Sequence, residues 1–232
     1  MTRLILILLF SYSVALGDGI VLQAASDQRA DYYSGRESIA IEGDVYVIKE
    51  LIIPPKVIEV TNAFYTHTVS LYNTSNPLYS ISWPTNRKTG KRVAPGWLAG
   101  MEIDSTLFSD VINDIFPHNQ GCSIRDGQSF NDKVIGKMRV FVKADPQTGQ
   151  ILYVVVRLYC SSQDKRMLAI PPEKIRQLEQ AVYARCKCFL PMLREVYRDD
   201  YINATYLPAS ATIGFSKEDI ECLIESQQVI NQ

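Results

Sequence analysis

The chain has 232 residues, a length that corresponds to one domain or two small ones and allows a full hydrophobic core. Hydrophobic residues make up 47% of the chain and charged residues 21%, an ordinary globular composition that excludes a low-complexity or disordered protein. The formal net charge is −1, so the strongly basic composition of a typical nucleic-acid-binding domain is absent. We therefore expect no nucleic-acid partner.

The first seventeen residues have the pattern of a cleavable signal peptide. A positive start at Arg3 precedes the apolar run 4–16, which is too short to span a bilayer core of about 30 Å. Small residues in Ala15-Leu16-Gly17 predict cleavage before Asp18. The first cysteine is Cys122, so the leader is not of the lipoprotein type. We expect an exported protein, periplasmic or secreted, with no transmembrane segment after cleavage.

Residues 18–100 are predicted to be a strand-rich amino-terminal region. Short runs of alternating or β-branched residues are separated by turn-forming Gly-Asp, Pro-Pro and Asn-Pro pairs. His67 falls on the alternating face of one such run and is interpreted as a packed strand residue, not as a ligand. The basic run 87–92 contains Thr-Gly and is interpreted as a solvated turn. Strands are predicted at 39–41, 45–48, 51–53, 57–60, 65–71 and 78–83.

Helical periodicity begins in the second predicted region, 101–232. Apolar residues recur at helical spacing between Leu107 and Phe116, with Asp104 or Ser105 as the N-cap and Pro117 as the stop. Residues 121–132 resemble a loop.

A β-hairpin follows, in which the runs 137–143 and 150–160 alternate on either side of the turn 144–149. Pro171-Pro172 then opens a second helix, and Ser216-Lys217-Glu218-Asp219 resembles the capping box of a short last helix. The pattern as a whole predicts an α+β fold, as two regions or as one continuous domain over 30–232.

The stretch from Asp104 to Pro191 resembles the carboxy-terminal domain of TonB-type periplasmic proteins. The resemblance implies a helix–β-hairpin–helix arrangement closed by Phe-x-Pro. The chain as a whole also resembles small exported proteins of unknown function found in gut Bacteroidota. TonB itself has an uncleaved anchor and a proline-rich spacer, so its energy-transducing role is not implied here. The matching residues are Gly136, Met138, Val140, Val142, Asp145, Gly149, 151–156, Phe189 and Pro191.

No catalytic, cofactor-binding or metal-binding motif is present in the sequence. G-x-S-x-G, H-E-x-x-H and a P-loop are all absent, and the acidic pair Asp110 and Asp114 is interpreted as part of a solvated helix face. Only two histidines occur, His67 and His118, and His118 near Cys122 is a weak candidate for a nucleophile–base pair. Export permits disulfides, but the sequence leaves their pairing open among Cys122, Cys160, Cys186, Cys188 and Cys222.

Aromatic residues with polar tips are in mild excess, and they suit a binding surface. The main expectation is a non-catalytic module that binds a protein or a cell-envelope component in the envelope or the exterior. A secreted hydrolase with no visible motif is the first alternative. A secreted eukaryotic interaction protein or effector is the second, and the sequons at Asn73 and Asn203 matter only for that alternative. The residues singled out as a binding surface are Tyr65, Tyr79, Trp83 and Trp97.

Overall fold

The computed structural model describes residues 31–57, 64–93, 100–117, 121–123, 134–161, 164–190 and 195–230. The predicted signal peptide, Trp97 and His118 lie outside these ranges. Within them, no helix has both the length and the apolar character needed to cross a lipid bilayer.

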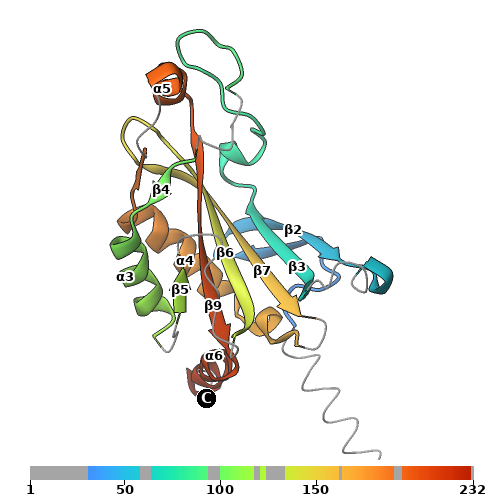
Figure 1. The fold of residues 1–232 in the computed structure, drawn as a ribbon. Helices are drawn as coiled ribbons and strands as arrows, with labels where there is room; N and C mark the ends of the chain where they lie inside the picture. Colours follow the sequence, from blue (N-terminus) through green and yellow to red (C-terminus); the bar gives the residue numbers. More distant parts are fainter. Residues whose placement is uncertain are drawn as a thin grey trace, which may run out of the picture.

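Seven strands form one antiparallel sheet, in the order β1-β2-β3-β7-β6-β9-β5 (Figure 1). Strands from both halves of the chain share this sheet, and the mixed α and β content agrees with the predicted class. The strands are β1 (Ser38–Ile41), β2 (Asp44–Ile52), β3 (Tyr65–Asn73), β5 (Gly121–Ser123), β6 (Val134–Ala144), β7 (Ile151–Ser161) and β9 (Leu207–Ser216). Strands β4 (Glu102–Ile103) and β8 (Cys188–Phe189) form a separate pair.

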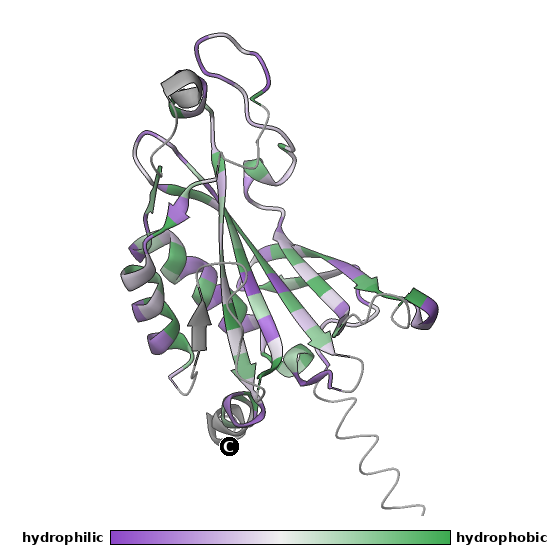
Figure 2. Cartoon of the chain, in the orientation of Figure 1, coloured by the Kyte–Doolittle hydropathy of each residue, from purple (hydrophilic) through white to green (hydrophobic). Residues whose placement is uncertain are grey.

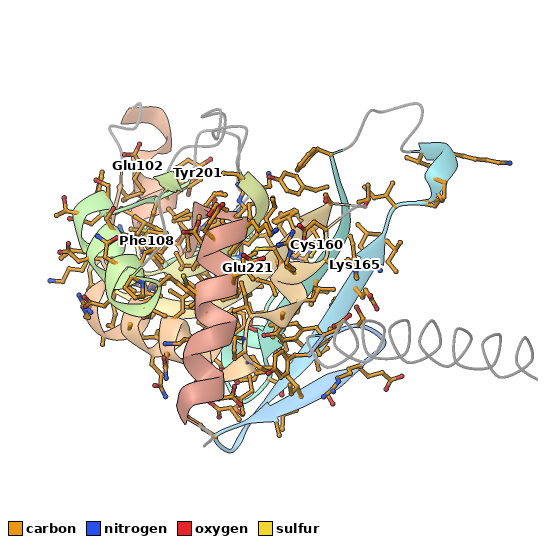
Figure 3. The ribbon with its side chains drawn as sticks, turned by 90° about the horizontal axis from the view of Figure 1, so that it is seen from below. Glu102, Phe108, Cys160, Lys165, Tyr201 and Glu221 are labelled. Carbon is orange, nitrogen blue, oxygen red and sulfur yellow. The ribbon has the colours of Figure 1, made fainter. Side chains whose placement is uncertain are left out.

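Helices α3 and α4 lie on one face of the sheet (Figure 1). The main hydrophobic core lies between these helices and the sheet. Phe116 at the end of α3 meets Phe215 of β9 edge to face, with ring centroids 5.4 Å apart. Helix α6 crosses one end of the sheet, with Glu221 on it (Figure 3). The helices are α3 (Ser105–Ile115), α4 (Pro172–Arg185), α5 (Glu195–Ile202) and α6 (Lys217–Ile230), with 3-10 turns η1 (Pro77–Tyr79) and η2 (Arg166–Ala169).

Several local predictions are confirmed. The Asp104 carboxylate accepts the amides of Thr106 and Leu107 and so caps α3. The capping box also forms, since the Ser216 amide donates to Asp219 at 2.6 Å and the Asp219 amide donates to the Ser216 hydroxyl at 3.2 Å. Both motifs work through contacts two or three residues apart, which is why the sequence could reveal them.

The predicted hairpin is β6 and β7, which pair at the centre of the sheet. Its turn is held by Asp145, whose side chain accepts the amides of Gln147 and Thr148. Gly149 has a φ of +72°, and a Cβ there would lie 2.1 Å from the carbonyl oxygen of Cys188. The turn therefore needs glycine for its conformation and for the close approach of β8.

The strand predicted at 78–83 is wrong. Pro77 and the Asn76 side chain, which accepts the amide of Leu78 at 2.9 Å, start the 3-10 turn η1 instead. The Lys143 ammonium donates hydrogen bonds to the carbonyl oxygens of Leu78 and Ile81, at 2.7 and 2.6 Å. Those carbonyls are therefore not available to a β-ladder.

Two smaller predictions also change. Val57 lies in a helical turn, its amide donating to the Pro54 carbonyl, and 58–60 lie outside the described residues. The predicted loop at 121–132 begins with strand β5.

Candidate functional site

The sheet has one face covered by helices and a second face that none of the described helices covers (Figure 1). Along β6 and β7, buried core residues alternate with half-buried residues that point to the second face. Figure 2 shows the hydropathy of the residues along these strands. On β6 these outward residues are Lys137, Arg139, Phe141 and Lys143. On β7 they include Arg157 and Tyr159, which pair with Arg139 and Lys137.

Cations and aromatic rings interleave over this second face. The Lys137 ammonium lies 4.5 Å from the ring centroid of Tyr65 and 5.0 Å from that of Tyr159. The guanidinium groups of Arg139 and Arg157 lie 4.7 and 4.9 Å from the Phe141 ring. Such contacts hold the cations in place at a favourable energy of about 0.5–1 kcal/mol each at exposed sites. We call the set Lys49, Tyr65, Tyr72, Lys137, Arg139, Phe141, Lys143, Arg157 and Tyr159 the basic aromatic face.

The basic aromatic face has no acidic counterpart within the sheet. No outward position of β2, β3, β6, β7 or β9 in the described strands carries Asp or Glu. Arg157 and Arg139 donate instead to the neutral hydroxyls of Ser70 and Ser210, at 2.9 and 3.0 Å. The described strands therefore contribute only positive charge to this face, although the whole chain has a formal net charge of −1.

A pocket of about 260 Å³ adjoins the basic aromatic face and is lined largely by Phe141, Val155, Tyr206 and Pro208. Lys143 closes one side of it, with its ammonium 4.8 Å from the Tyr206 ring. Burial lowers the pKa of Lys143. Because its ammonium also binds two carbonyls, Lys143 anchors the segment after η1 and contributes less than the other cations to the open surface.

Two of the four aromatic residues predicted as a binding surface belong to this side of the sheet. Tyr65 is part of the basic aromatic face, and Tyr79 packs on Tyr72 with ring centroids 6.2 Å apart. Trp83 is 50% exposed in the segment whose neighbouring residues line the pocket. Trp97 lies outside the described residues.

The cations were missed at the level of sequence, although one signal was present. The run 137–143 alternates Lys, Arg, Phe and Lys with apolar residues, which places all four on one strand face. Their meeting with Arg157 and Lys49 depends on the pairing of β2, β3, β7 and β6. That register is a property of the folded sheet.

A cysteine–histidine pair also occurs, in a form unsuited to catalysis. His67 on β3 lies opposite Cys160 on β7, and its Nε2 is 2.6 Å from a carboxylate oxygen of Glu50. His67 is buried, as predicted for a strand residue. Burial, followed by the charges of Asp31 and Asp164, raises the pKa of the Cys160 thiol to about 12. The thiol is fully buried and protonated at neutral pH, so it is not an activated nucleophile.

Cysteines and sequons give no further site. In the described part of the chain, no three His, Cys, Asp or Glu side chains converge to hold a metal ion. The thiols at 160, 186, 188 and 222 are free. Asn73 is 4% and Asn203 6% exposed, and both amide groups donate to carboxylates, so neither sequon offers a free side chain on the folded surface.

Comparisons with known proteins give one similarity to report, with a solved structure. No protein-family model matches it, and no curated protein matches it. The chain is similar to a crystal structure of a DUF5043 family protein from Bacteroides uniformis, with 12% sequence identity and a TM-score of 0.47. The match covers 78% of this chain and 91% of that chain. At this level of similarity nothing about function is transferred.

Proposed function

We propose that this protein is a non-catalytic binding module whose basic aromatic face binds an acidic surface of a partner protein. The observation that carries the proposal is the gathering of four cations with aromatic rings on one face of the sheet: Lys49, Lys137, Arg139 and Arg157. A surface with one sign of charge attracts partners of the opposite sign and orients them on approach.

The ring contacts favour a protein over a nucleic acid. Nucleobases bind open sheets by stacking on the faces of exposed aromatic rings. Here Arg139 and Arg157 lie over Phe141, and Lys137 lies over Tyr65 and Tyr159. The cations therefore occupy the ring faces that bases would need.

The proposal also includes a cellular location and a family resemblance, both of which rest on the sequence alone. The signal-peptide pattern of residues 1–17 supports export to a periplasm or the exterior, where the partner would be a protein of the cell envelope or its surroundings. The likeness of 104–191 to the carboxy-terminal domain of TonB supports a module that works by protein contact. A secreted hydrolase is the second candidate, because Asp44 and Glu179 line the same cleft and both pair with Arg176.

The test measures binding of fluorescently labelled poly-L-glutamate by anisotropy at several salt concentrations. We expect binding that weakens as salt rises, because exposed charges are screened within about 10 Å at 0.1 M. Replacing Lys49 and Lys137 together by glutamine should weaken binding by about twofold to thirtyfold, at about 0.2–1 kcal/mol for each of the two exposed contacts.

The control is the double substitution of Lys174 and Lys217 by glutamine, which makes the same charge change on α4 and α6. It should leave the affinity for polyglutamate unchanged. Equal weakening in both double variants would contradict a role for the basic aromatic face. Tighter binding of heparin or single-stranded DNA than of polyglutamate, at the same salt, would contradict an acidic protein as the partner.

A further inference from the structure

A second cleft lies where α4 meets the ends of β2 and β3, with a volume of about 550 Å³. It is separate from the basic aromatic face, because α4 covers the opposite side of the sheet (Figure 1). Most of its lining residues carry polar side chains, and the residues that matter here are Asp44, Asn73, Asn76, Arg176, Glu179 and Tyr183.

The wall of this cleft is a fixed ionic network around Glu179, which is 2% exposed. Glu179 accepts hydrogen bonds from the Tyr46 hydroxyl, from Asn73 at 3.1 Å and from Arg176 at 3.2 Å. Arg176 also pairs with Asp44 at 2.5 Å. Burying such a network is seldom better for stability than apolar packing. Its position along a cleft therefore fits a role in recognising a ligand.

Two hydrogen-bond donors at the cleft have no acceptor within the part of the chain that the structure describes. The buried Nε of Arg176 has no hydrogen-bond partner among the described residues. The Tyr183 oxygen accepts from Asn76 and from the amide of Val154, both at 3.2 Å, which leaves its own proton to donate. Burial, followed by the charge of Glu179, raises the pKa of Tyr183 to about 12, so this proton is present at neutral pH.

The charges of the cleft select against an anionic ligand. Two carboxylates and one guanidinium line it, and the guanidinium is already paired with both. A suitable ligand would offer a neutral oxygen acceptor to the Tyr183 hydroxyl and neutral donors to the partly exposed Asp44 carboxylate. Hydroxyl groups do both, and the Tyr183 ring adds an apolar surface.

We propose that this cleft binds a neutral carbohydrate of one or two sugar units. Its volume falls within the range of about 300–1,000 Å³ that is usual for small-molecule sites. Glu179 acts in the network as a positioning residue, because both of its oxygens accept hydrogen bonds from the protein. The site holds the sugar and does not cleave it.

The test uses ligand-detected NMR and calorimetry with glucose, galactose, mannose, N-acetylglucosamine and lactose, and with galacturonate as an anionic comparison. We expect at least one neutral sugar to bind with a dissociation constant below about 10 mM, and to bind more tightly than galacturonate. Tyr183→Phe should weaken that binding about threefold to tenfold through the lost hydroxyl. Tyr72→Phe, which removes a hydroxyl on the other face of the sheet, should not change it.

Gln180→Trp provides a second variant in case Tyr183→Phe disturbs folding. Gln180 is exposed at the cleft, so a large side chain there should block entry without touching the network. Failure of every neutral sugar to bind, tighter binding of galacturonate, or unchanged binding in Gln180→Trp would overturn the proposal. Hydrolysis of nitrophenyl glycosides that is lost in Glu179→Gln would overturn it in favour of a hydrolase. None of these results bears on polyglutamate binding at the basic aromatic face.

Discussion

Replacing Glu179 by glutamine should lower the free energy of unfolding by about 3 kcal/mol. The side chain is 2% exposed, and three donors converge on it, from Tyr46, Asn73 and Arg176. Breaking a buried ion pair by removing one partner costs about 3–5 kcal/mol. The value lies at the low end because the amide oxygen of glutamine still accepts one hydrogen bond, while its NH₂ group must face other donors.

The measurement is urea unfolding followed by circular dichroism, together with thermal melting. At about 2–4 °C per kcal/mol for a chain of this size, the melting temperature should fall by about 6–12 °C. Glu102→Gln makes the same chemical change at an exposed position on β4 and should shift the unfolding free energy by less than about 0.5 kcal/mol. A loss below about 1 kcal/mol in Glu179→Gln would refute the network as a stabilising feature.

Three further predictions concern the hairpin turn and the thiols. Gly149→Ala forces a Cβ against the carbonyl of Cys188 at a φ of +72°, so thermal melting should show a loss of at least about 2 kcal/mol, and an unchanged melt would contradict the strain. Burial raises the pKa of Asp145, but hydrogen bonds from Arg87 and two turn amides outweigh it and hold the pKa below its usual 3.8. The stability from this carboxylate is therefore present above pH 3.8 and lost as the pH falls through the lower folded value, so urea unfolding should show a flatter acid decline in Asp145→Asn than in the parent. Burial raises the thiol pKa values of Cys160, Cys186 and Cys188 to about 11 or 12. These three thiols should therefore react with Ellman's reagent at pH 8 only after denaturation. Fast reaction in the native protein would show that the thiols are accessible and would contradict the prediction.

The sequence by itself determined the elements whose signals are local. The cap at Asp104, the alternation through β6 and β7 and the capping box at Ser216 act between residues a few positions apart. The hydrogen bonds of each motif close within one turn or one hairpin. Neighbouring residues in the sequence are therefore enough to predict the motif.

Only the tertiary structure decided the elements and surfaces that depend on distant partners. Residues 78–83 were predicted as a strand, and the Lys143 ammonium, more than 60 positions away, holds their carbonyls in another geometry. The basic aromatic face needs the register that places Arg157 beside Arg139. The Glu179 network joins residues 133 positions apart, Tyr46 and Glu179. A buried carboxylate is stable only where several donors converge on it, and folding alone brings those donors together.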